Sequence, residues 1–567
     1  MLLSNLTLLA TAPEGVARLR ELILTLAVQG KLVPQDLKDE PASELLKKIR
    51  LEKDRLIAEG KIKRDKTLAK IAEEEKPFGL PNGWEWARWA EIAMMIGDID
   101  HKMPSEVSDG LPYVSARDFF GKNEIDFAGA KKIGRSDFLE LASKIRPEKG
   151  DLIYPRYGTI GVIRMVMDNR EFLASYSCAV IKVLRGCIEP GYQYLFSMSD
   201  CVKRQATSAT NKTTQPNVGL KSIQGYLVPV PPLVEQSRIV TRVEELMRLC
   251  DALEAKGQLE ATQHAQLVST LLATLTDSET PAQLTDNWHR IATHFNLLLD
   301  RPQAVDALEQ TILQLAVRGL LVPQDLQDEP ASELLKKIRN EKDRLIAEGK
   351  IKPGKPLAEI AEEDKPFGLP KGWEWVRLNS LLQKIGAGST PLGGREVYAY
   401  SGVKFLRSQN VYDDGLRLHA VAYIKPETHA NMTGTVVVAN DLLFNITGAS
   451  IGRCAVVPND FDEANVSQHV TIVRTVFPAL NAFLHKVLVS RHIQQAVMDV
   501  QVGVSREGLS IAKLSQFLIP VPPLAEQSRI VARVGSLHAL CANLRQRLIT
   551  ARTQQALLAE VLVKEVA

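Results

Sequence analysis

Side chains that could do chemistry are present in this 567-residue sequence, but none stands in the spacing that catalysis would need. No Gly-x-x-x-x-Gly-Lys-[Ser/Thr] stretch occurs, so a phosphate-binding loop for ATP is missing. No Asn-Pro-Pro or Asp-Pro-Pro precedes an aromatic residue, which is the arrangement that an amino-methyltransferase uses. Glu254-Ala-Lys256 resembles the end of a nuclease motif but has no matching upstream acid. We therefore expect no catalytic residue and no enzymatic activity in this chain.

Metal binding and disulfide bonding are equally unsupported by the spacing of histidine and cysteine. None of the six cysteines forms a Cys-x-x-Cys pair, which argues against a zinc site and for a reducing compartment. Cys250 and Cys541 occupy matching helical positions, where a small buried residue is expected. His101, His419 and His469 are interpreted as surface or packing residues. We expect no metal and no cofactor in this chain.

The bulk composition is that of a globular protein. The net charge is +3 and the isoelectric point about 8.3, which permits a nucleic-acid partner without arguing for one. Residues 1–12 are apolar but lack the positive charge of a signal peptide. No run approaches the ~20 apolar residues of a membrane span. We expect a cytoplasmic protein without a membrane partner.

The elements that must position any binding residues are written twice in the chain. Residues 23–89 match 312–378 with 54 of 67 positions identical, and residues 226–250 match 517–541 with 17 of 25 identical. Between these scaffold blocks, residues 90–225 and 379–516 have nearly equal lengths but align poorly. Near-identical scaffolds around divergent inserts indicate one platform that presents two different readers. A recent duplication followed by drift is the alternative, although drift would not spare the scaffolds alone.

Each scaffold block contains predicted helices. Pro41 and Pro330 begin a pattern with apolar 3–4 spacing that Gly60 and Gly349 would end. A second helix follows Pro231-Pro232 and its copy. The apolar seam in these second helices has the 4–3 spacing of a coiled coil and consists of Ile239, Val243, Leu246, Cys250 and Leu253 in the first copy and Ile530, Val534, Leu537, Cys541, Leu544 and Leu548 in the second.

The ordered set GKLVPQDLKDEPASELL, FGLPNGWEW and VPVPPLVEQSRIV, present twice in closely similar form, resembles the specificity subunits of Type I restriction-modification systems. The resemblance covers essentially the whole chain. It implies an α/β (α+β) fold with two globular target-recognition domains joined by long helices, which form an antiparallel coiled-coil spacer in a pseudo-twofold repeat. The expected segments are a scaffold at 1–79, a recognition domain at 80–230, a helix, linker and second scaffold at 231–368, a second recognition domain at 369–521, and a final helix at 522–567.

The resemblance also implies function and partners. Each recognition domain would read one half of a bipartite double-stranded DNA target, and the helices would set the gap. Two modification subunits would methylate adenine with S-adenosylmethionine, and two restriction subunits would use ATP and Mg²⁺ to translocate and cleave DNA. A coiled-coil interaction scaffold that does not bind DNA is the main alternative. A fragment of a fused restriction enzyme is another, against which the missing methyltransferase motif argues.

Three segments of each insert carry candidate DNA contacts, because base edges are read by polar and basic side chains and close backbone approach favours glycine. An ordinary polar turn is the alternative for the first two segments, and a mobile polar loop is the alternative for the third. The candidates in the first insert are Ser115, Arg117, Arg156, Tyr157, Gly158, Thr159, Lys203, Arg204, Lys212 and Lys221. The candidates in the second insert are Arg407, Gln409, Asn410, Asn445, Thr447, Ser450, Arg491, Ser505 and Arg506.

Overall fold

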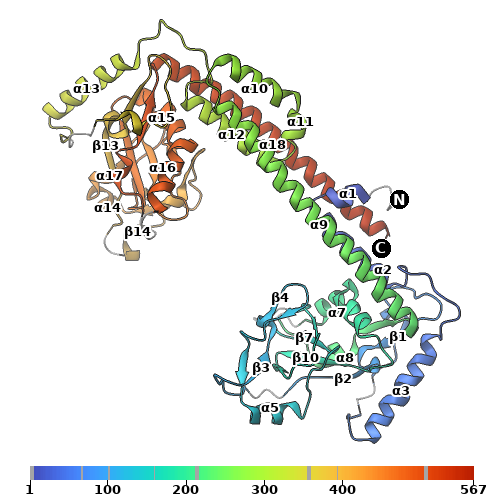
Figure 1. Ribbon diagram of the computed structural model, residues 1–567. Coiled ribbons are helices and arrows are strands. Elements are labelled where there is room, and N and C mark those ends of the chain that lie inside the picture. The colour runs from blue at the N-terminus through green and yellow to red at the C-terminus, as the bar shows by residue number, and fades with distance from the viewer. Residues whose placement is uncertain are drawn as a thin grey trace. The chain divides into compact units, whose positions relative to one another are not determined.

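The computed structural model describes residues 6–64, 68–99, 103–158, 160–210, 216–353, 359–391, 394–502 and 508–566. The chain divides into two compact units. The first comprises residues 1–260 and 552–567, and the second comprises residues 261–551. The two longest helices, α9 (Leu233–Thr276) and α18 (Leu524–Val566), each contribute residues to both units (Figure 1).

The first unit combines scaffold helices with an α/β domain. Its four-stranded antiparallel sheet has the order β2-β10-β7-β8, and a second sheet has the order β6-β3-β9. The helices are α1 (Leu6–Thr11), α2 (Gly15–Val28), α3 (Ala42–Ala58), α4 (Trp89–Ile92), α5 (Arg135–Ala142), α6 (Pro190–Met198), α7 (Asp200–Ala209) and α8 (Leu220–Gly225). The strands are β1 (Glu85–Arg88), β2 (Ala93–Gly97), β3 (Leu111–Val114), β4 (Phe119–Phe120), β5 (Glu124–Ile125), β6 (Lys131–Ile133), β7 (Leu152–Pro155), β8 (Arg164–Met165), β9 (Leu173–Ala174), β10 (Cys178–Val183) and β11 (Leu227–Val230).

The second unit has an equivalent four-stranded sheet and a second sheet of five strands in place of three. Its orders are β13-β23-β20-β21 and β14-β18-β15-β22-β19. The helices are α10 (Pro281–Thr293), α11 (Phe295–Leu298), α12 (Pro302–Val317), α13 (Ala331–Ala347), α14 (Pro426–Ala430), α15 (Asn481–Leu488), α16 (Arg491–Val502) and α17 (Ile511–Leu514). The strands are β12 (Glu374–Arg377), β13 (Leu382–Ala387), β14 (Tyr398–Ala399), β15 (Val403–Leu406), β16 (Val411–Tyr412), β17 (Gly415–Leu416), β18 (Ala422–Ile424), β19 (Val436–Val437), β20 (Leu442–Asn445), β21 (Cys454–Val456), β22 (Ala464–Val466), β23 (Val470–Thr475) and β24 (Leu518–Val521).

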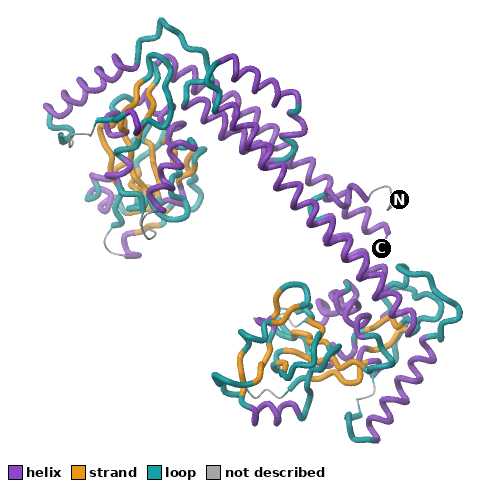
Figure 2. The backbone as a smooth tube through the Cα atoms, viewed as in Figure 1, coloured by secondary structure: helices purple, strands orange, loops and turns teal. Residues whose placement is uncertain are grey.

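The central strands explain why the two inserts share a fold despite their poor alignment. β10 and β23 are buried along nearly their whole length, and each pairs on both sides with antiparallel neighbours. Continuous burial favours mostly apolar runs, which CAVIKV and VTIVRT both are, although VTIVRT also buries the hydroxyls of Thr471 and Thr475. Most strands of the described residues gather in these two α/β domains (Figure 2).

In each domain, the strand that enters from the scaffold pairs with the strand that returns to it. β1 pairs antiparallel with β11, and β12 pairs antiparallel with β24 in the equivalent register. β11 and β24 lead directly into the long helices, so each domain leaves the scaffold and returns to it at one place. The divergent residues therefore lie in a loop of chain whose two ends are fixed side by side.

The long helices pack on scaffold helices within their own units. In the first unit Ile239, Val243 and Cys250 share an apolar cluster with residues of α2 and with Ala559 of α18. In the second unit Ile530, Val534 and Cys541 share a cluster with residues of α12 and with the end of α9. Leu246, Leu537, Leu544 and Leu548 are partly buried against these clusters, and Leu253 is half-buried.

Helices α3 and α13 lie within the ranges that the sequence predicts. Pro41 and Pro330 precede them in extended backbone, where proline has no amide hydrogen to offer the helix. Gly60 and Gly349 follow them with φ of 69° and 68°, a left-handed conformation that glycine adopts without a steric penalty.

Candidate DNA-reading surface

The first predicted segment of the first domain forms a polar turn at the end of β3. The backbone amide and the hydroxyl of Ser115 donate to Asp118 at 2.7 and 3.0 Å. Arg117 stands between them and is exposed. The turn is thus fixed by Asp118, which leaves the Arg117 side chain on the surface.

The second and third predicted segments meet at the end of β7. The amide of Val218 donates to the carbonyl of Arg156 at 2.9 Å, and the amide of Gly158 donates to Pro216 at 3.0 Å. Tyr157 forms a β-bridge with Asn217. Gly158 has a φ of 69°, so a larger residue would strain this turn.

Arg156 itself is engaged inside the domain. Its side chain is buried, with 8% exposure, and pairs with Asp98. Its Nε donates to the carbonyl of Val218 at 3.2 Å. A contact between Arg156 and DNA stays a prediction, and it would require this ion pair to open.

A fourth segment, which the sequence analysis missed, joins the others. The amide of Ser175 donates to Val114 at 2.7 Å, and the amide of Arg156 donates to Ser177 at 2.8 Å. Residues 175–177 therefore connect the turn after β3 to the turn after β7. The available signal was a serine at both 175 and 467, each following a short buried strand.

The second domain repeats this arrangement with other side chains. The amide of Ser467 donates to Leu406 at 2.9 Å, and the amide of Ile446 donates to His469 at 3.0 Å. The amide of Leu509 donates to the carbonyl of Ile446 at 2.8 Å, as Val218 does to Arg156. The same backbone contacts thus gather residues 115–118, 156–158, 175–177 and 216–218 in one domain and 407–410, 445–450, 467–469 and 508–509 in the other. We call these groups the reading loops.

Asparagines shape the reading loops of the second domain from within. Asn410 is buried, accepts from the amide of Arg407 at 2.9 Å and donates to Arg417 at 2.8 Å. Asn445 is fully buried and donates to the carbonyl of Ser408 at 2.9 Å and to the hydroxyl of Ser450 at 3.1 Å. Asn410 and Asn445 thus serve loop structure in this conformation.

Other side chains of these loops reach the surface. Gln409 is exposed, and Thr447 Oγ1 lies 2.6 Å from Nδ1 of the exposed His469. This hydrogen bond joins two reading loops through side chains alone. It gives the second domain an imidazole where the first has Ser177.

The remaining predicted basic residues lie on helices. Lys203 and Arg204 are exposed on α7, which packs against α2 and α6, and Arg204 pairs with Asp200 at 2.5 Å. Arg491 is exposed at the start of α16, which packs against α12 and α15. Lys221 is exposed on α8, three residues after Val218. The predicted residues Thr159, Lys212, Ser505 and Arg506 lie outside the described residues.

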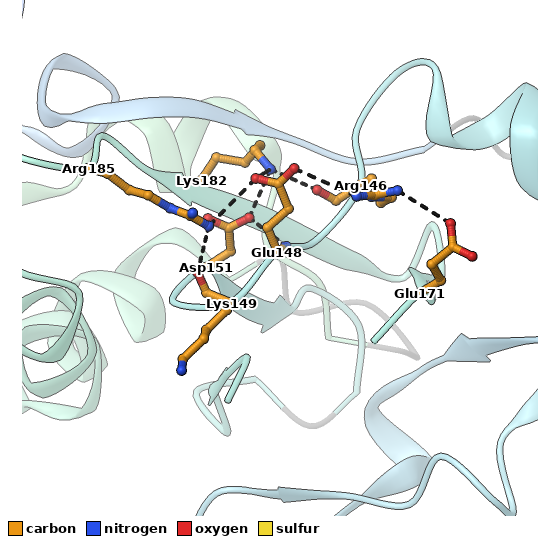
Figure 3. A network of polar contacts seen from close by, with 7 residues as sticks. All are labelled: Arg146, Glu148, Lys149, Asp151, Glu171, Lys182 and Arg185. Carbon is orange, nitrogen blue, oxygen red and sulfur yellow. Dashed lines mark hydrogen bonds and ion pairs between the residues drawn. The ribbon is translucent and has the colours of Figure 1, made fainter. Parts of the chain in front are cut away.

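An ion-pair network pins the opposite end of β7 (Figure 3). Lys182 Nζ lies 3.0 Å from the buried Asp151 and 3.2 Å from Glu148. Burial raises the pKa of Asp151, and the charge of Lys182 opposes that shift. In the second domain Arg474 holds the equivalent Asp441 at 2.6 Å. Asp151 and Asp441 have a structural role, because each pairs with a basic side chain of a central strand, Lys182 of β10 or Arg474 of β23.

No group of three or more His, Cys, Asp or Glu side chains in the described ranges is placed to hold a metal ion. No helix among those residues is long and apolar enough to cross a membrane.

The chain is similar in sequence to one family of known proteins. The sequence model of the Type I restriction modification DNA specificity domain matches residues 84–263 and 370–551. The chain is 36% identical to the Type I restriction enzyme EcoAI specificity subunit of Escherichia coli and 34% identical to the EcoEI specificity subunit of that organism, each over 97% of this chain and 93% of the relative. The crystal structure of the HsdS subunit from Thermoanaerobacter tengcongensis is 19% identical with a TM-score of 0.37, over 87% of this chain and 98% of that chain.

Proposed function

This chain belongs to the family of Type I restriction-modification DNA specificity subunits, and from this premise we propose how its two domains divide the reading of DNA. It is a specificity subunit with two recognition domains, the role of its relatives. Relatives of this kind supply target recognition and no catalysis.

We propose that each recognition domain reads one half of a bipartite duplex target with its reading loops. The observation that carries this is the gathering of four loops by the same backbone contacts in both domains. The side chains on this common frame differ, because Gln409 and His469 of the second domain occupy the positions of Arg117 and Ser177 in the first. Because base edges are distinguished by donor and acceptor pattern, the two half-sites should differ in sequence.

We propose that recognition domains at 80–230 and 369–521 are held apart by an antiparallel coiled-coil spacer built from α9 and α18. These helices contain 44 and 43 residues, long enough for a spacer, since a helix rises about 1.5 Å per residue. The burial of seam residues in both units supports this role. The scaffold segments at 1–79, 231–368 and 522–567 would complete a pseudo-twofold molecule.

The scaffold also suggests how partners bind. We propose that the two near-identical scaffolds dock two modification subunits, which carry S-adenosylmethionine and methylate adenine. Two restriction subunits with ATP and Mg²⁺ would complete the assembly. A complex that holds one modification subunit at saturating concentration would contradict the docking proposal.

A methylation map tests the reader role. The chain would be co-expressed with the methyltransferase subunit of its operon in a host without such systems, and the DNA sequenced for N6-methyladenine. A two-part motif with a fixed unspecified gap, methylated on both strands, is the expected result. A purified complex that leaves no motif would overturn the proposal and favour an interaction scaffold.

A further inference from the structure

A buried glutamate lies in the first turn of each long helix. Glu235 is the third residue of α9 and has no exposed surface, and Glu526 is the third residue of α18 with 2% exposure. Burial raises the pKa of both carboxyls, and hydrogen bonds from neighbouring donors oppose the shift. An acid is seldom placed in such a position without partners.

Each glutamate joins the helix to two other segments. Glu235 accepts from the indole of Trp84 at 3.1 Å and from Gln35 at 3.3 Å. Trp84 belongs to the segment that leads into the first recognition domain, residues 81–86. Gln35 belongs to the turn after α2, residues 30–39. Its side-chain amide also donates to the carbonyl of Gly30 in that turn at 2.7 Å. We call these the lead-in segment and the scaffold turn.

The scaffold turn is fitted closely to the lead-in segment. Gly30 has a φ of 70°, and a Cβ atom there would lie 2.5 Å from the ring of Pro81. Asp39, at the end of the turn, pairs with Arg238 of α9 at 2.5 Å. Three segments distant in sequence therefore meet at Glu235.

The second copy has the same geometry around a different recognition domain. Glu526 accepts from Trp373 at 3.0 Å and from Gln324 at 3.0 Å. Arg529 pairs with Asp328 at 2.5 Å. A Cβ atom on Gly319 would lie 2.5 Å from the ring of Pro370, the same close approach as between Gly30 and Pro81. The arrangement thus accompanies the long helix and does not depend on which bases the attached domain reads.

We propose that Glu235 and Glu526 are positioning residues. By holding the lead-in segment and the scaffold turn on the first turn of a long helix, each fixes the orientation of one recognition domain. Each thereby restricts the gap between half-sites that the subunit accepts. This inference rests on the proposed function, because a gap exists only if the two domains read two half-sites. It concerns the spacing of the half-sites and not their sequence. One base pair adds about 3.4 Å of rise and about a tenth of a turn to the gap, so a neighbouring gap is admitted only if a domain can shift and turn on its helix.

The methylation map of the full complex tests this inference. In Glu235→Ala, the share of methylation at sites whose gap is one base pair longer or shorter should rise about tenfold, the effect of one lost hydrogen bond to a charged group. The letters of both half-sites should stay the same. Glu526→Ala should give the same result. Glu235→Gln should keep the original gap, because its side-chain oxygen still accepts from Trp84.

Glu244→Ala, at an exposed position of the same helix, is the matched control. If Glu235→Ala gives no soluble complex, Trp84→Phe decides, since it removes the donor and keeps an aromatic ring. An assembled Glu235→Ala or Trp84→Phe complex with the single wild-type gap would overturn the inference. Absence of any motif with the wild-type chain would instead overturn the proposed function.

Discussion

The hydrogen bond between Thr447 and His469 shows how one reading loop presents the side chain of another. The imidazole is exposed, and its Nδ1 is engaged by the hydroxyl at 2.6 Å. This leaves Nε2 oriented by the protein and able to meet a base edge. A side chain held in this way costs less conformational entropy on binding than a free one.

Replacing His469 with alanine should relax one position of the half-site read by the second domain. A bidentate base contact is worth about 1–3 kcal/mol of discrimination, and a single hydrogen bond from Nε2 lies at the low end, so selectivity at that position should fall about tenfold. The methylation map measures this directly. His419→Ala, which changes an exposed histidine outside the reading loops, should leave the motif intact. An unchanged motif in the His469 variant would show that this ring does not read DNA.

Sequence reasoning placed three of the four reading loops, because polar residues at strand ends are visible as breaks in apolar runs. It missed residues 175–177 and 467–469, whose side chains differ between domains. It also could not see that Arg156 pairs with Asp98, since 58 residues separate them. Hydrogen bonds across such distances depend on sheet order, which spacing alone does not reveal.

A buried histidine makes the stability of the second domain depend on pH. Burial and, to a smaller extent, the charge of Lys486 lower the pKa of His485 to about 4, against hydrogen bonds to the backbone that raise it. The unfolded chain therefore binds a proton below pH 6.5 that the folded domain refuses down to about pH 4. Stability is retained at neutral pH and lost as pH falls through this window.

Between pH 7 and pH 5 this histidine should cost the second domain about 2 kcal/mol of unfolding free energy. Denaturant unfolding followed by hydrogen exchange of residues 481–488 would measure the loss. His485→Gln retains a donor for the carbonyl of Cys454, which the ring contacts at 2.9 Å, but does not titrate. Its stability should fall less over the same interval, and an equal fall in both proteins would assign the pH effect to other groups.

At the scale of elements, apolar periodicity predicted the long helices and named seam residues that are largely buried, while the coiled coil itself stays a prediction. It could not predict what covers that seam, because any helix of matching shape would satisfy the pattern. Within the first unit α2 contributes to the cover, and within the second unit α12 does. Each scaffold copy therefore supplies a long helix and a shorter one that packs on it.

In the proposed spacer, a heptad added to α9 alone would lengthen one of the two helices and leave the other unchanged. We therefore expect a matched pair of insertions, after Leu253 in α9 and after Leu548 in α18, to lengthen the recognised gap and leave both half-sites unchanged. The heptads add about 10 Å of helix, or about three base pairs. The methylation map would measure the new gap. Altered half-site letters would contradict the role of the helices as a spacer.

At the scale of the molecule, the family comparison confirms a chain with two recognition domains, and the structure has a mixed helix and strand fold. The duplication in the sequence predicted this organisation, because the scaffolds are nearly identical. The composition of the units was not predictable in the same way. Residues 552–566 follow the second domain in sequence but lie in the first unit, where Ala559 is buried with Leu9 and Ile239.

Removing residues 552–567 should therefore weaken the first unit more than the second. The deletion uncovers apolar side chains of α9 and removes the pair between Arg18 and Glu560, which lie 3.1 Å apart. Hydrogen exchange should increase in residues 15–28 and 239–250. Residues 302–317, which pack on the earlier part of α18, serve as the internal control. Equal exchange in both regions would contradict this assignment.

The placement of Ala559 also constrains the order of events during translation. The ribosome makes the first recognition domain early, but residues 552–566 are added only after the whole of the second unit has been synthesised. Until then the start of α9 and the helices α1 and α2 lack part of their apolar cover. This apolar surface therefore stays partly uncovered while about three hundred further residues are synthesised. A chaperone that recognises unburied aliphatic side chains could bind the surface during that time.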